Sequence, residues 1–173
     1  MESRRVISSQ NGHKVRALGY FADKYHCSQA VLAAYAAECG ISEEQALKLG
    51  SCLGSGMRKG EVCGACTGAL MVLGLLYGQC HKGNDKERQR SNIVNDLMMN
   101  RFKEVNGSYI CSDLLKCDMS TPEGVQYATD NSLFVDFCPE MVASAVDILE
   151  EIIRHMQKNE EYIETAKGDD SGS

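Results

Sequence analysis

The sequence predicts an all-α fold, a single domain built as a bundle of five or six helices. Apolar residues recur at helical spacing in several segments, and alternation with the period of a strand is nowhere sustained. Only two prolines interrupt the 173 residues, and the 43% of hydrophobic residues supply a sizeable core for one domain. We expect residues 1–160 to form the helical domain and the polar residues 161–173 to form a disordered tail.

The first three helices are predicted from their capping residues and apolar spacing. Residues 8–11 are expected to begin the first helix. Cys27 is expected to begin the second, which Gly40 ends because glycine readily adopts the left-handed conformation found after helices. Ser42 and Gln45 match a capping box, in which each side chain satisfies a free backbone N–H group of the other residue. The third helix should therefore begin directly after Ser42.

A glycine-rich loop at residues 54–61 precedes the most apolar segment of the chain. From Cys63 to Tyr77 we predict a buried helix, with a parallel strand as the competing interpretation for part of it. Arg58 and Lys59 raise the alternative of a phosphate-binding loop, but the GK[ST] ending of a P-loop is missing, so we favour a structural loop beside the cysteines. Glycines four residues apart in the helix permit close approach of another helix or a ligand, which leaves a homodimer open.

The second half of the chain is predicted to hold a long helix, a short helical turn and a strong final helix. Residues 82–90 read as a turn and an exposed helix start, and apolar residues then recur at helical spacing until Gly107. A short helical segment begins at Cys111, whereas residues 118–132 are expected to be irregular. Cys138 begins the last helix, since the proline that follows it fits a first helical position.

Composition and charge exclude several classes of protein. The net charge of −6 argues against a non-specific nucleic-acid surface, and no apolar run is long enough for a membrane span. The first residues lack a secretory hydrophobic region, so the cytoplasm is the expected compartment. Nine cysteines, an odd number without a signal peptide, argue against a disulfide scaffold. In a reducing compartment, clustered thiols indicate metal ligation or redox chemistry.

Four of these cysteines fall at predicted helix beginnings, namely Cys27, Cys63, Cys111 and Cys138. A helix N-terminus presents unpaired N–H groups and partial positive charge, so we expect a lowered thiol pKa and a stabilised thiolate at each position. Cys63 and Cys66 also form a CxxC, a spacing used by zinc sites, iron–sulfur sites and dithiols. Because only one such pair occurs, a zinc ribbon built from two pairs is excluded.

The other candidates give weaker signals. Cys117 follows Cys111 at a spacing that is not diagnostic. Cys39, Cys52 and Cys80 lie near predicted helix ends, where ordinary helix packing is the favoured interpretation. His26 precedes the first candidate cysteine and is an alternative ligand, although a lone histidine is more often a surface or hydrogen-bonded residue.

The order of the cysteines carries a resemblance to a known family. Along the chain stand Cys27, the hexapeptide CGACTG at residues 63–68, Cys111 and Cys138. This series resembles the C-GCAxxG-C-C family of redox-active proteins, and the resemblance covers most of the chain. The Ala-x-x-Gly part matches as written, whereas the preceding Cys and Gly stand in the reverse of the family's order. The resemblance implies a small redox-active or metal-binding protein whose four signature cysteines map onto Cys27, Cys63, Cys111 and Cys138.

Three functions stay open, in the following order. The first is an iron–sulfur cluster on these four cysteines, serving electron transfer or redox catalysis with an unidentified redox partner protein, and whether the protein is an enzyme, an oxidoreductase, stays open. The second is a structural or regulatory zinc site on the same residues. Three roles stay open for Cys66, namely an additional metal ligand, a resolving thiol, or packing. The third is a metal-free dithiol in which Cys63 attacks and Cys66 or Cys27 resolves. The metal, the electron donor and acceptor, and the oligomeric state are not determined by the sequence.

Overall fold

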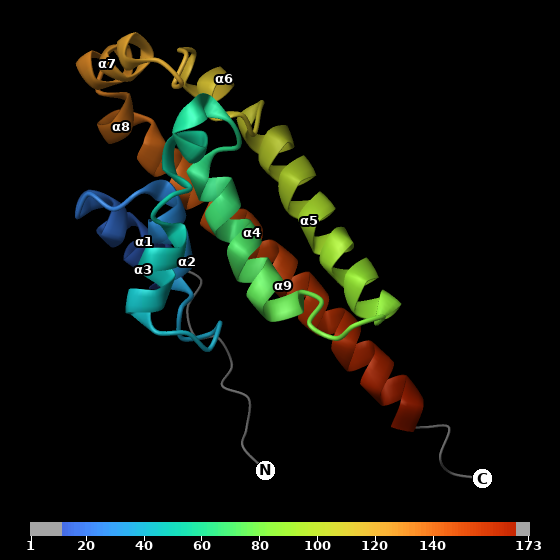
Figure 1. Ribbon diagram of the computed structural model, residues 1–173. Coiled ribbons are helices and arrows are strands. Elements are labelled where there is room, and N and C mark those ends of the chain that lie inside the picture. The colour runs from blue at the N-terminus through green and yellow to red at the C-terminus, as the bar shows by residue number, and fades with distance from the viewer. Residues whose placement is uncertain (1–11, 169–173) are drawn as a thin grey trace.

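The regular structure of this chain is helical throughout the part that a computed structural model describes, residues 12–168, with side chains described up to Lys158. The elements, in chain order, are α1 (Gly12–Ala22), α2 (Cys27–Ala34), α3 (Glu43–Gly50), the π-helical turn η1 (Gly56–Gly60), α4 (Gly64–Tyr77), α5 (Asp85–Asn106), α6 (Cys111–Leu115), α7 (Pro122–Asp130), α8 (Leu133–Asp136) and α9 (Cys138–Gly168). Figure 1 shows α4, α5 and α9 running side by side, with α1–α3 on one flank and α6–α8 at one end.

The all-α prediction is confirmed, and the strand interpretation of residues 63–77 is wrong, because that segment forms α4. The described residues nevertheless form nine helices rather than five or six. The difference comes mainly from residues 118–132, which are not irregular as expected. Thr121 caps α7 by accepting a hydrogen bond from the backbone N–H of Gly124, and Pro122 occupies the first turn. The same residues that resemble a turn therefore begin a helix.

Local capping signals account for most of the observed helix boundaries. The predicted capping box at Ser42 and Gln45 forms and begins α3. Gly107 ends α5 in the left-handed conformation, with φ of 88°. At the C-terminus, α9 continues to Gly168, so residues 161–168 of the expected disordered tail are helical, and residues 169–173 lie outside the described residues. The expected start of the first helix, residues 8–11, also lies outside them.

Small residues let α2 and α4 approach each other closely. A Cβ atom on Gly68 of α4 would lie 2.8 Å from the backbone oxygen of Ser28, and one on Gly64 would lie 3.3 Å from Cβ of Cys27. By contrast, a Cβ on Gly74 would meet nothing within 4 Å. The spacing of Gly64 and Gly68 thus serves packing within the chain, and it brings the beginning of α2 beside the beginning of α4.

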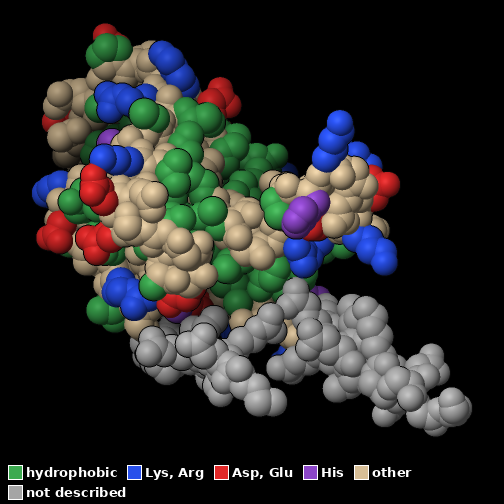
Figure 2. All heavy atoms as spheres, turned by 60° about the horizontal axis from the view of Figure 1, so that its bottom comes forward, with side chains coloured by type: hydrophobic (Ala, Val, Ile, Leu, Met, Phe, Trp, Pro, Cys, Tyr) green, Lys and Arg blue, Asp and Glu red, His purple; other side chains and the backbone are tan. Residues whose placement is uncertain are grey.

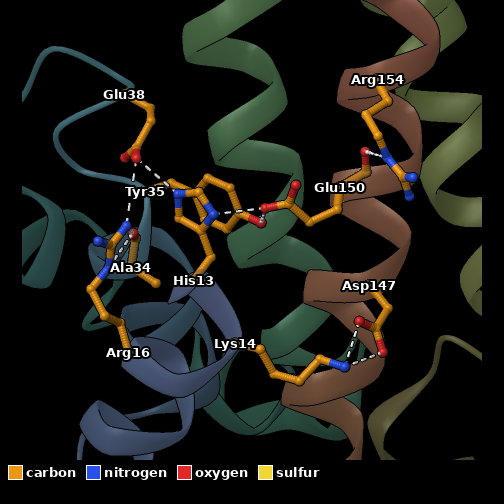
Figure 3. A network of polar contacts seen from close by, with 9 residues as sticks. All are labelled: His13, Lys14, Arg16, Ala34, Tyr35, Glu38, Asp147, Glu150 and Arg154. Atoms are coloured by element: carbon orange, nitrogen blue, oxygen red, sulfur yellow. Dashed lines mark hydrogen bonds and ion pairs between the residues drawn. The ribbon is translucent and has the colours of Figure 1, made fainter. Parts of the chain in front are cut away.

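A buried polar network joins α1, α2 and α9 (Figure 3). His13 is only 3% exposed, and its ring stacks on Tyr35 with the ring centroids 4.0 Å apart. Its Nε2 lies 2.8 Å from Oε1 of Glu38, and its Nδ1 lies 2.7 Å from Oε1 of Glu150. The hydroxyl of Tyr35 donates to Glu150. Buried charges persist when they are paired in this way.

Some hydrophobic side chains stay on the surface. Figure 2 shows them gathered in the middle of one face, with Lys, Arg, Asp and Glu mainly towards its edges. Exposed large hydrophobic residues include Leu49, Leu75, Ile93 and Leu97. None of the described helices has the length and apolar character that crossing a membrane requires.

Candidate functional site

The four candidate cysteines occupy the beginnings of four helices, as the sequence predicts. Cys27, Cys111 and Cys138 are the first residues of α2, α6 and α9, and Cys63 is the N-cap of α4. All four side chains line one cavity of about 940 Å³. Residues separated by up to 111 positions (138 − 27) are thereby brought to one place.

Backbone pairing holds Cys63 beside Cys111. The N–H of Cys63 donates to the carbonyl of Tyr109 over 2.8 Å, and the N–H of Cys111 donates to the carbonyl of Glu61 over 2.6 Å. These two bonds form an isolated antiparallel bridge between the residues just before α4 and those just before α6. Both helices consequently begin at the same wall of the cavity.

The remaining two cysteines reach the cavity from α2 and α9. Cys27 is placed by the close α2–α4 packing at Gly64, and its thiol hydrogen-bonds to the sulfur of Cys138. That hydrogen bond, followed by burial, raises the pKa of Cys27 well above its ordinary value, and the same bond lowers the pKa of Cys138. The proton affinity of the Cys27 sulfur is therefore higher than that of the Cys138 sulfur.

Of the four thiol pKa values that the helix beginnings predict to be lowered, only that of Cys138 is lowered, whereas those of Cys27, Cys63 and Cys111 are raised. Burial raises the pKa of Cys63 to about 11, although interactions with the N–H groups of Ala65 and Cys66 favour the thiolate. At Cys111, burial and the nearby Cys63 and Cys138 raise the pKa to about 12. The expectation is wrong because removal from water disfavours a charged sulfur more than the helix ends favour it. A bound cation would take the place of these protons.

The four sulfur atoms surround the cavity without closing on a single point. Among the described residues, ligand atoms of three side chains come within 4.8 Å of one another only at Cys80, His81 and Glu87, which lie elsewhere. In a tetrahedral all-sulfur zinc site, with Zn–S of 2.3 Å, neighbouring sulfur atoms stand about 3.8 Å apart. The cavity cysteines are therefore spaced more widely than one small ion requires.

The wall of the cavity is positively charged although the whole chain is acidic. Lys24, Arg58 and Lys59 line it, and none of the described Asp or Glu residues does, despite a net charge of −6. The rest of the wall is largely apolar, and includes Phe21, Leu114, Met119, Phe134, Phe137 and Met141. Such a wall attracts a negative group and keeps water from the sulfur atoms.

The glycine-rich loop presents part of this charge in a strained conformation. Ser55, Met57 and Arg58 all have left-handed backbones, with φ of 53°, 56° and 57°. A left-handed residue other than glycine costs about 1–2 kcal/mol, so the loop stores strain beside the cysteines. The end of the loop packs closely on α6, because a Cβ on Gly60 would clash with Oγ of Ser112. Strain of this kind is common at functional sites.

Comparison with known proteins agrees with this geometry. Residues 25–152 match the family described as "Putative redox-active protein (C_GCAxxG_C_C)". The chain belongs to the C_GCAxxG_C_C family. The matched residues include every cysteine that lines the cavity. No curated protein and no solved structure matches the chain.

The other cysteines of this C_GCAxxG_C_C protein lie outside the cavity wall. Cys66 is fully buried in the core, with its sulfur 3.6 Å from that of Met99, and does not line the cavity. Cys39 packs partly buried against the core, as expected. Cys52 and Cys80 are exposed, so ordinary packing does not explain them, and that prediction is wrong.

His26 and Cys117 lie close to the cavity. His26 lines it and caps α2, where its backbone N–H donates to the side chain of Gln29. Cys117 is half-buried, and its sulfur lies 3.7 Å from that of Met119, which does line the cavity. The sequence did not predict the apolar and cationic residues of the wall. Their shared cavity forms only where α6–α8 pack over the beginnings of α2, α4 and α9.

Proposed function

We propose that this protein binds an iron–sulfur cluster through Cys27, Cys63, Cys111 and Cys138 and uses it in electron transfer or redox catalysis. The observation that carries the proposal is the meeting of four thiols, each from the beginning of a different helix, in one cavity. Four cysteine thiolates are the usual ligands of such clusters. When bound, the cluster supplies one-electron oxidation and reduction.

The spacing of the thiols favours a cluster over a single zinc ion. A cluster contains several iron atoms, and each iron atom has its own cysteine ligands. The cysteine sulfur atoms therefore need not converge on one point. The described cavity cysteines do not converge within 4.8 Å in any group of three. A zinc site would need the four helix beginnings to draw together around one ion.

The charges of the wall also favour a cluster. Four thiolates and inorganic sulfide give such a group net negative charge, which a buried site must offset. Lys24, Arg58 and Lys59 provide that compensation from outside, and the N–H groups of four helix beginnings provide it from behind the cysteines. The aromatic side chains Phe134 and Phe137 limit the access of water.

The setting of this chemistry is also part of the proposal. All nine cysteines are free thiols, a state that persists in reducing compartments, which supports a cytoplasmic location. The electrons come from, or go to, a separate redox partner protein.

The test is metal analysis of protein purified and reconstituted without oxygen. We expect iron, acid-labile sulfide and charge-transfer absorbance in the wild type, and loss of all three in Cys63→Ser. Cys52→Ser is the matched control, because Cys52 is exposed and lies outside the cavity wall, and it should keep the cluster. A colourless wild-type protein that takes up no iron, or that takes up stoichiometric zinc instead, would contradict the proposal.

A second candidate is a dithiol, favoured by the hydrogen bond between Cys27 and Cys138. Oxidation of this pair by an external disulfide would form one S–S bond, reduce the oxidant to two thiols, and transfer both protons to it. Alkylation followed by mass spectrometry at defined redox poise separates the candidates. If iron-free protein shows a reversible two-electron oxidation that is confined to these two cysteines, the result favours the dithiol.

A further inference from the structure

A second group of potential ligands lies at the other end of α4. Cys80 and His81 stand in the loop between α4 and α5, and Glu87 lies in the first turn of α5. Because α4 has 14 residues, this loop is about 20 Å from Cys63 along the helix axis. Figure 1 shows the α4–α5 loop at the opposite end from α6–α8, and Figure 2 shows this region as a projection that carries charged and histidine side chains.

The three ligand atoms converge closely. The sulfur of Cys80 lies 3.3 Å from Nδ1 of His81, and the same Nδ1 lies 2.7 Å from Oε1 of Glu87. All three atoms lie within 4.8 Å of one another. In a tetrahedral zinc site an imidazole nitrogen and a carboxylate oxygen stand about 3.3 Å apart, and a sulfur and a nitrogen about 3.6 Å apart. A bound ion would therefore replace the proton between His81 and Glu87 and move these two ligand atoms about 0.6 Å further apart.

The carboxylate is fixed before any ion arrives. Oε2 of Glu87 accepts hydrogen bonds from the backbone N–H groups of Cys80 and His81, each over 3.0 Å. This leaves Oε1 directed at the imidazole. Orientation of a ligand by its outer hydrogen bonds is typical of metal sites.

Packing does not account for the thiol in this group. Cys80 is exposed, whereas a free cysteine that serves only as a small hydrophobic residue is normally buried. His81 is also largely exposed, with 72% of its side-chain surface accessible. One side of the group faces water, which can complete a fourth coordination position.

We propose that Cys80, His81 and Glu87 form a separate binding site for a divalent zinc-type cation. One thiolate, one imidazole and one carboxylate suit a borderline ion such as Zn²⁺, whereas Mg²⁺ prefers an all-oxygen site. A bound ion would clamp the loop to the first turn of α5 and so hold the C-terminal end of α4. The site is independent of the cluster in the cavity, since it shares no residue with it.

The test is titration of the full-length protein with Co²⁺, a spectroscopic probe for zinc sites, under anaerobic conditions. We expect Cys80→Ser and His81→Ala each to bind one equivalent of Co²⁺ fewer than the wild type, or to bind that equivalent at least about 100-fold more weakly. The near-ultraviolet sulfur-to-cobalt absorbance of that equivalent should disappear in Cys80→Ser. Zn²⁺ should raise the melting temperature of the wild type more than that of Cys80→Ser, and Mg²⁺ should compete with neither ion.

Two controls make the outcome decisive. Cys52→Ser removes another exposed thiol and should behave as wild type, and Cys63→Ser should keep the equivalent at the α4–α5 loop. If Cys80→Ser binds Co²⁺ with the stoichiometry and affinity of Cys52→Ser, the proposed site does not exist. An iron-free cavity can itself bind Co²⁺ through its cysteines, but that binding should be lost in Cys63→Ser and kept in Cys80→Ser. Failure of the proposed function and failure of this site are therefore distinguishable.

Discussion

At the scale of single residues, the cavity combines neutral thiols with cations held in a strained loop. The pKa values of Cys63 and Cys111 are raised by burial, which only the folded chain provides. Arg58 lines the cavity from a left-handed backbone position, where a residue other than glycine is unfavourable. Charge at this position is therefore maintained at a cost in stability, as is common in functional sites.

Arg58→Gly should separate these two effects. Relief of the left-handed strain should raise the free energy of unfolding by up to about 1 kcal/mol, measured by urea denaturation, because glycine adopts this backbone freely. Loss of the cation should lower the reduction potential of the reconstituted protein, measured by electrochemical titration, because the added negative charge of the proposed cluster is less well offset.

Met57→Gly is the matched control, since Met57 has the same backbone conformation without a charge or a place in the cavity wall. It should give the gain in stability with an unchanged potential. An equal potential shift in both variants would mean that the loop, and not the charge of Arg58, tunes the site.

At the scale of elements, the helices begin where local signals place them, but their mutual approach depends on particular glycines. The beginnings at Cys27, Cys63, Cys111 and Cys138 are confirmed. Gly68 permits the close contact of α4 with Ser28 in α2, whereas Gly74, on the same helix, has open space around it. Two residues with the same helix propensity therefore have different roles.

Gly68→Ala and Gly74→Ala should change stability in opposite directions. The new Cβ at Gly68 lies 2.8 Å from a backbone oxygen that cannot move aside cheaply, so the free energy of unfolding should fall by about 1–3 kcal/mol. At Gly74 alanine should stabilise the helix by up to about 1 kcal/mol. Thermal and urea unfolding of both variants check this prediction.

Cluster content gives a second readout for the same pair. Because Gly68→Ala separates α2 from α4, and with them Cys27 from Cys63, it should also reduce iron incorporation. Normal iron content and normal stability in Gly68→Ala would show that the α2–α4 contact is not needed for the site.

At the scale of the whole molecule, the buried network at His13 ties the first helix to the last (Figure 3). Burial lowers the pKa of His13, but the interactions with Glu150 and Glu38 outweigh burial and raise it above the ordinary 6.5. Burial raises the pKa of each carboxyl, yet His13 lowers both below the ordinary 4.5. Between pH 4.5 and pH 6.5, His13 is therefore protonated while Glu38 and Glu150 are ionised.

The pH dependence of stability follows from these directions. The contribution of His13 is fully present below pH 6.5 and is lost as the pH rises through its raised pKa. The contribution of the carboxylates is present above pH 4.5 and is lost as the pH falls through their lowered pKa values. The free energy of unfolding from this network should be greatest between pH 4.5 and 6.5, as measured by urea denaturation across pH.

His13→Phe tests the network, because phenylalanine keeps the stacking on Tyr35 but removes the charge. It leaves Glu150 buried without a cation, so stability at pH 5.5 should fall by about 3 kcal/mol. The decline of stability above pH 6.5 should become weaker. Lys14→Met breaks the exposed ion pair with Asp147 and should cost less than about 1 kcal/mol. Equal losses in the two variants would contradict a special role for the buried pair.

The sequence alone determined the all-α class, most helix boundaries and the four cysteines at helix beginnings, because apolar spacing and capping are properties of neighbouring residues. Local reasoning failed at α7, where the same Thr-Pro-Glu-Gly residues fit a turn or a helix start. Only the tertiary structure decided that the four thiols share one cationic cavity, that burial raises the pKa of Cys63, and that Cys66 faces the core. These features depend on contacts between distant helices and on removal from water, which no short stretch of sequence encodes.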